Sequence, residues 1–157
     1  MIKRFLTIIL LAWAAFIETP ITAQARGTIA DVGISIIPQP RSVQLKDGNW
    51  QLQQGVAIGC TDVQTKQVAQ FFADKLQRST GYTIPVADSG GITLCIDRAS
   101  GLAEEAYRLS VKPDGVKVVA STPKGLFRGM STFMQLLPAQ VESPCVVKGV
   151  KWAAPCV

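Results

Sequence analysis

Apolar and polar residues alternate with a period of two in several short segments, which predicts β-strands that bury one face. The clearest case is residues 107–120, where Tyr107, Leu109 and Val111 alternate with polar residues before a Pro-Asp-Gly turn. We expect a β-hairpin there. A second hairpin, around an Asp-Gly turn, and three single strands are expected over residues 42–53, 56–59, 83–86 and 92–96.

Two other segments show the 3.6-residue period of amphipathic helices. The first helix should begin near Thr61, whose hydroxyl would form a capping box with Gln64, and end at Gly81. The second should be capped by Ser121 or Thr122 and end before Pro138. The side chains expected to form the core are Val68, Phe72, Leu76, Tyr107, Leu109, Val111, Leu126, Met130, Phe133 and Leu137.

The order of these elements predicts an α+β fold, a mostly antiparallel sheet with two helices packed on one face. We assign this domain to residues 34–138. Gly125 and Gly129 lie four residues apart on the second helix, which indicates close approach to a neighbouring backbone rather than a membrane motif, since Lys124 and Arg128 surround them. Residues 139–157 are irregular in pattern, and we expect them to be a linker.

Residues 1–25 have the three parts of a signal peptide: basic residues, an apolar run and an Ala-x-Ala cleavage site. A membrane anchor is the alternative, but the apolar run is shorter than a span of about 20 residues and ends at Glu18. We therefore expect an exported protein, periplasmic or extracellular, with no stable membrane anchor after cleavage. Residues 26–33 form a polar leader.

The net charge of +5 comes from basic residues that are dispersed along the chain rather than gathered in a run. This pattern is typical of a solvated surface, and we expect no nucleic-acid partner. The chain contains no histidine and no C-x-x-C pair among its four cysteines, which argues against a zinc site.

The cysteines instead raise the question of disulfides, because an exported chain meets an oxidising compartment. Cys145 and Cys156 are the candidate disulfide, since residues close in sequence meet easily. Two alternatives stay open: a bridge between Cys60 and Cys95, and four reduced thiols.

No residue pattern indicates catalysis, a cofactor or a metal. Without histidine, Ser-His-Asp and Cys-His nucleophile schemes are excluded. Glu104 and Glu105 are adjacent, so on a strand they would point to opposite faces and could not flank one bond. Gly90-Gly91 lacks the context of a phosphate-binding loop. We predict no catalytic, cofactor-binding or metal-binding residue.

Three motifs together resemble a known family. They are I-I-P-Q-P-R at residues 36–41, E-A-Y-R-L-S-V at residues 105–111, and G-L-F-R-G-M-S-T-F-M-Q-L-L-P at residues 125–138. In this order and spacing they resemble the N-terminal accessory domain of bacterial β-N-acetylhexosaminidases of glycoside hydrolase family 20. The resemblance implies a sheet with two helices that packs against a following (β/α)8 barrel. It also implies that the expected linker, residues 139–157, leads toward a catalytic barrel that is missing from this chain.

The resemblance carries over no catalytic residue. The family's sugar-binding Arg and its Asp-Glu pair lie in the barrel on motifs like R-G-x-x-x-D and H-x-G-G-D-E, which this chain lacks. We therefore expect a truncated, non-catalytic chain. One alternative is the N-terminal domain of a family 84 glycosidase. Another is a stand-alone exported glycan- or protein-binding module, for which Trp50, Trp152, Tyr82 and Tyr107 are the available aromatic residues.

The signal-peptide interpretation makes a direct prediction. Signal peptidase should cleave after Ala25, because Ala23 and Ala25 supply the small residues that the enzyme accepts. N-terminal sequencing of the exported protein should begin at Arg26. Recovery of the protein with residues 1–25 retained in the membrane fraction would contradict the prediction.

Overall fold

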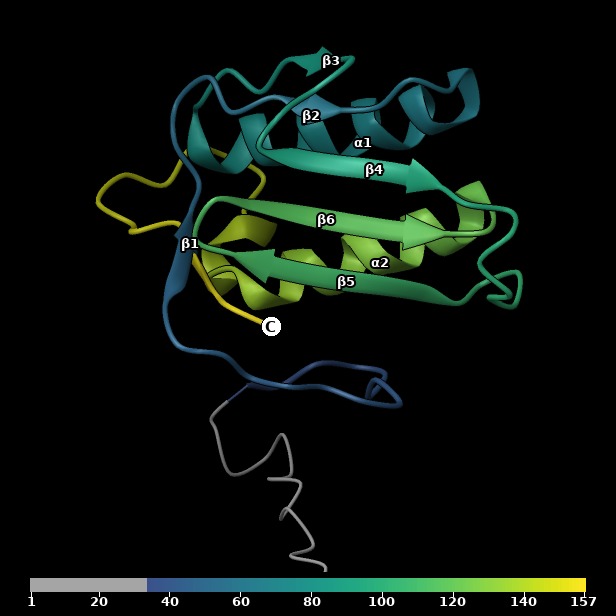
Figure 1. The fold of residues 1–157 in the computed structure, drawn as a ribbon. Helices are drawn as coiled ribbons and strands as arrows, with labels where there is room; N and C mark the ends of the chain where they lie inside the picture. The colour runs from purple at the N-terminus through teal and green to yellow at the C-terminus, as the bar shows by residue number, and fades with distance from the viewer. Residues whose placement is uncertain (1–33) are drawn as a thin grey trace, which may run out of the picture.

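A computed structural model of the chain describes residues 34–157. A five-stranded sheet forms one layer, and two helices cover one of its faces (Figure 1). The predicted signal peptide and the leader lie outside the described residues. Within residues 34–157, no helix combines the length and the apolar character needed to cross a membrane.

The first helix, α1 (Val63–Thr80), begins one residue later than the sequence suggested. The predicted capping box of Thr61 with Gln64 does not form, because the carboxylate of Asp62 takes its place. Asp62 Oδ1 accepts hydrogen bonds from the backbone N–H groups of Gln64 and Thr65, at 2.9 and 3.2 Å. The predicted end is confirmed: Gly81 adopts a left-handed conformation with φ 73°, which suits a residue without Cβ.

The second helix, α2 (Pro123–Leu136), follows the sequence prediction closely. Thr122 is the cap, and its Oγ1 accepts a hydrogen bond of 3.2 Å from the N–H of Gly125. Pro123 occupies the first helical position, where a missing N–H costs nothing. A single apolar stripe of α2 faces the sheet, and its predicted members are buried: Leu126, Met130, Phe133 and Leu137.

The large sheet is mixed, which corrects the expectation of a mostly antiparallel one. Its strands are β2 (Ile58–Gly59), β3 (Val86–Ala87), β4 (Ile92–Ile96), β5 (Tyr107–Lys112) and β6 (Gly115–Ala120), in the order β3-β2-β4-β6-β5. The predicted hairpin β5–β6 is confirmed and antiparallel, whereas β2–β3, β2–β4 and β4–β6 are parallel. The parallel pairs arise because α1 is a crossover from β2 to β3, and because β6 inserts between β4 and β5.

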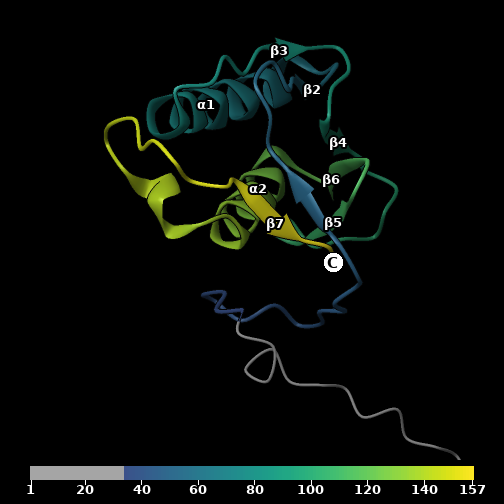
Figure 2. The same ribbon diagram turned by 90° about the vertical axis from the view of Figure 1, so that its left-hand side faces the viewer.

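A second, two-stranded sheet joins β1 (Asn49–Gln51) to β7 (Ala153–Pro155), with Trp50 opposite Ala154. The two strands lie side by side in Figure 2. The hairpin predicted over residues 42–53 is therefore wrong. Its alternating residues do form a strand, but the partner comes from the C-terminal end of the described chain, beyond the reach of local turn signals.

Residues 139–157 belong to the folded domain and are not a linker. They contain the short 3₁₀ helix η2 (Ala139–Glu142) and then β7. Trp152, Ala154 and Cys156 alternate along this segment, and all three are buried. An alternating apolar pattern at the end of the segment thus buries one face of β7 against the core.

The core lies between the helices and the large sheet, and it extends beneath β1 and β7. Seven of the ten predicted core residues are buried, and the other three, Val68, Tyr107 and Leu109, are partly buried against them. The sequence prediction missed the two tryptophans, Trp50 and Trp152, which are 4% and 2% exposed. The Trp50 ring meets the Phe133 ring edge-on at 5.6 Å between centroids, so it ties β1 to α2.

Phe133 lies at the centre of this core with no exposed surface. Phe133→Ala should lower the free energy of unfolding by about 3–5 kcal/mol, because it removes a buried ring and leaves a cavity. Phe71→Ala is the matched control, since that ring is 51% exposed and should cost clearly less. Urea unfolding of both variants measures the difference. Equal losses, or a loss below about 1 kcal/mol for Phe133→Ala, would contradict the placement of this ring.

Candidate functional site

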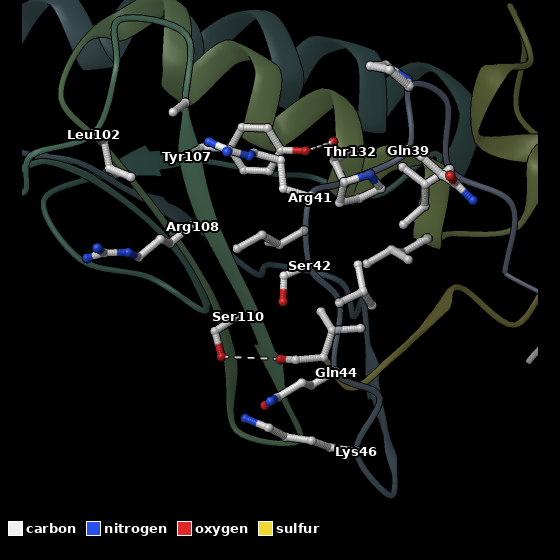
Figure 3. A pocket seen from close by; sticks show the side chains of 18 residues that line it. Gln39, Arg41, Ser42, Gln44, Lys46, Leu102, Tyr107, Arg108, Ser110 and Thr132 are labelled. Atoms are coloured by element: carbon white, nitrogen blue, oxygen red, sulfur yellow. Dashed lines mark hydrogen bonds between the residues drawn. The ribbon is translucent and has the colours of Figure 1, made fainter. Parts of the chain in front are cut away.

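A groove of about 680 Å³ lies between the N-terminal segment 36–46 and strand β5. Residues 106–110 and Val157 form one wall, and the N-terminal segment forms the other (Figure 3). Both ends of that segment are tied down. The backbone of Ile37 exchanges two hydrogen bonds with the amide of Gln135, at 2.8 and 3.0 Å, and the N–H of Lys46 donates to the carbonyl of Cys156 at 2.9 Å.

The groove contains several polar groups. The hydroxyls of Tyr107 and Thr132 are hydrogen-bonded to each other at 2.5 Å, and Arg41, Arg108 and Lys46 supply positive charge. Neither a carboxylate nor a thiol is among the residues that line it. Its polar lining thus consists of hydroxyl, amide and cationic side chains.

The adjacent carboxylates Glu104 and Glu105 lie in the turn before β5, not on the strand itself. Both reach toward α2. Glu104 accepts a hydrogen bond of 2.7 Å from the Lys124 ammonium, which lowers the pKa of Glu104, and Glu105 forms an ion pair of 3.2 Å with Arg128. Each carboxylate is exposed and has its own cation on α2.

The two glycines of α2 are explained by close packing, as predicted. A Cβ at Gly125 would lie 2.6 Å from the carbonyl oxygen of Ala106, and a Cβ at Gly129 would lie 2.4 Å from Cγ1 of Val118. Real Cβ atoms do not approach other atoms so closely. The two glycines of the motif at residues 125–138 are therefore explained by the close contact of α2 with β5 and β6.

All four cysteines are free thiols in the structure. The candidate disulfide of Cys145 with Cys156 is not formed: Cys145 is exposed beside Ser143, and Cys156 is buried beside Gly48. The alternative bridge of Cys60 with Cys95 is not formed either. Burial raises the pKa of the Cys60 thiol, which keeps it protonated and unreactive.

Two further kinds of site are a metal centre and an aromatic platform for sugars. Within the described part of the chain, no three His, Cys, Asp or Glu side chains gather closely enough to hold a metal ion. An aromatic platform for sugar stacking would need exposed rings. Trp50 and Trp152 are buried, and Tyr82 and Tyr107 are partly buried against the core. The exposed aromatic rings are Phe71 and Phe127, which lie 5.3 Å apart where α1 meets α2.

The sequence prediction did not identify the groove as a site. Its one available signal is the pair Pro38 and Pro40, which lack the backbone N–H groups that a sheet partner would need. That pattern indicates an extended segment held apart from the sheet. It does not reveal what lies opposite, because the contact with β5 spans about seventy residues of sequence.

Comparisons with known proteins agree with the fold. Residues 33–152 match the family model of glycosyl hydrolase family 20, domain 2. A β-hexosaminidase of Porphyromonas gingivalis is 33% identical over 132 residues, which cover 77% of this chain and 17% of that protein.

The chain is also similar to hexosaminidases of known structure. The N-acetyl-β-hexosaminidase of Streptomyces plicatus, in complex with Thio-NAglucal, is 34% identical with a TM-score of 0.72, covering 78% of this chain and 24% of that one. The β-N-acetylhexosaminidase of Streptomyces coelicolor A3(2) is 31% identical with a TM-score of 0.72, covering 77% and 25%. The chain thus spans a quarter or less of the length of these relatives. This chain belongs to glycosyl hydrolase family 20, and it contains domain 2 of that family.

Proposed function

We propose that this chain is the non-catalytic accessory domain of an exported β-N-acetylhexosaminidase, an enzyme of glycan hydrolysis. In this proposal it works beside a (β/α)8 catalytic domain that follows it in the same polypeptide. The relatives that it resembles are named as hexosaminidases, and it matches only a small part of each. The family 20 match favours this proposal over a family 84 glycosidase.

One observation carries the non-catalytic role: the chain matches domain 2 of family 20 over residues 33–152 and covers a quarter or less of the hexosaminidases that it resembles. The single pair of adjacent carboxylates is consistent with this role. Glu104 and Glu105 bind Lys124 and Arg128 of α2 and thereby fix the entry to β5 beside the helix. Glycosidases generally need carboxyl groups placed on either side of the scissile bond, or one such group assisted by the substrate. Carboxylates held on cations at a helix surface do not serve that purpose.

The export part of the proposal rests on the N-terminal sequence. Its basic start, apolar run and Ala-x-Ala site support secretion of the protein before it meets an extracellular or periplasmic glycan.

The purified chain should therefore release no product from an aryl N-acetylglucosaminide, because its sequence lacks the H-x-G-G-D-E motif that carries the Asp-Glu pair of family 20. The Streptomyces plicatus enzyme serves as the positive control in the same assay. A double variant, Glu104→Gln with Glu105→Gln, is the matched negative control. Turnover that survives repurification of the natural chain and disappears in this variant would overturn the proposal.

A further inference from the structure

One face of the large sheet is covered by α1 and α2, and the other carries no helix or strand among residues 34–157 (Figure 1). Side chains alternate between the two faces of a strand. Val111 of β5 and Val118 of β6 lie on the helix side and have no exposed surface. Arg108 and Lys112 of β5 and Lys117 of β6 therefore lie on the open face, and all three are exposed.

The strand register places these three cations next to one another. Lys117 lies opposite Ser110, which is midway between Arg108 and Lys112 along β5. Neighbouring strands lie about 5 Å apart and alternate residues about 7 Å apart, so the Cα of Lys117 is roughly 8 Å from that of each β5 cation. Basic residues that are dispersed in the sequence thus form a compact triangle in the fold.

Two shallow hollows lie on the open face between these side chains. The larger one has a volume of about 610 Å³, and Arg98 joins Arg108 and Lys117 in lining it. Arg98 is on the turn after β4, which is tied to the end of β6 by a backbone hydrogen bond of 2.8 Å from the N–H of Asp97. The smaller one, of about 260 Å³, is lined by Lys112 and Lys117. These four cations, Arg98, Arg108, Lys112 and Lys117, are called the basic face below.

The charge of the basic face is only partly balanced within the described part of the chain. The ion pairs found among residues 34–157 all use cations of α1 or α2. Two carboxylates, those of Asp97 and Asp114, lie at the hollows, and Asp97 Oδ1 accepts a hydrogen bond of 3.0 Å from the N–H of Ala99. Four cations against two carboxylates leave an excess of positive charge, which attracts an anionic partner.

The other side chains of the open face indicate what kind of anion fits. The large apolar side chains that are exposed among residues 34–157 lie elsewhere: they are Ile37, Val63, Phe71, Phe127 and Val146. Binding to a lipid surface usually adds apolar side chains that enter it, and single-stranded nucleic acids are held by stacking on aromatic rings. The open face instead offers cations with the hydroxyls of Thr93 and Ser110 beside them. It is suited to a ligand held by charge and hydrogen bonds alone.

We propose that the basic face binds a sulfated polysaccharide, whose successive sulfate groups pair with Arg108, Lys117 and Lys112 along the sheet. The planar guanidinium of Arg108 suits two oxygens of one sulfate group. Each exposed charge contact is weak, and a polymer that makes several of them at once binds more tightly through multivalency. The choice of a polysaccharide among anionic polymers rests on the proposed function, because an accessory domain of a glycan-hydrolysing enzyme meets glycans.

Binding of fluorescently labelled dextran sulfate and neutral dextran to the purified chain tests the proposal, with dextran sulfate expected to bind and dextran not. Arg108→Gln with Lys117→Gln should weaken dextran sulfate binding at least about fivefold, because it removes two of the four cations. The matched control, Lys148→Gln with Lys151→Gln, makes the same change of charge at exposed residues outside the large sheet. It should leave the affinity within about twofold.

Alkylation of the natural chain by uncharged iodoacetamide locates the binding without any substitution. Cys95 is partly exposed in the larger hollow of the basic face. Cys145 is fully exposed near the end of α1, where the N–H of Val147 donates to the carbonyl of Ser79 at 2.8 Å. Saturating dextran sulfate should slow the alkylation of Cys95 and leave that of Cys145 unchanged.

Several results would overturn the proposal. They are equal binding of dextran and dextran sulfate, absence of binding by either, equal losses of affinity in the two double variants, and unchanged alkylation of Cys95 at saturation. Tighter binding to phosphatidylglycerol vesicles or to single-stranded DNA than to dextran sulfate would assign the basic face to another partner and would also overturn it. None of these measurements involves turnover, so failure here is distinguishable from failure of the proposed function.

Discussion

The structure depends on the close contact of α2 with the β5–β6 hairpin, made where Gly125 and Gly129 face the sheet. A helix without side chains at these two positions lies directly on the strand backbone and on Val118. This closeness brings Lys124 and Arg128 within reach of the carboxylates that precede β5. It also places the buried stripe of α2 against the sheet, where apolar burial supplies most of the stabilisation.

The peripheral elements are organised by the same contact. Phe133 on α2 packs against Trp50, which holds β1, and β1 in turn pairs with β7. β7 leads to Val157 and its pairing with Val111 at the outer edge of β5. Glu104 and Glu105, the adjacent carboxylates that could be taken for a catalytic pair, form ion pairs with Lys124 and Arg128 of α2. The groove beside β5 is a surface to which a partner could bind, which agrees with the accessory role proposed above.

Local features of this fold could be predicted from the sequence, and long-range pairings could not. The β5–β6 hairpin, the ends of α2 and the cap at Gly81 follow from turn and cap chemistry within a few residues. The pairing of β1 with β7 and the parallel strands join distant segments, for which a short alternating run offers several equivalent partners. The groove was missed for the same reason, because its two walls meet only in the folded chain.

Unfolding free energies of three variants test the helix contact most directly: Gly129→Ala, Val118→Ala and the double variant. Gly129→Ala should destabilise the chain by about 1–3 kcal/mol through overpacking against Val118. Val118→Ala makes room for the added methyl group, so the double variant should lose less than the sum of the single losses by at least about 0.5 kcal/mol. Stabilisation by Gly129→Ala, toward the gain of about 1 kcal/mol expected from helix propensity alone, would contradict this account.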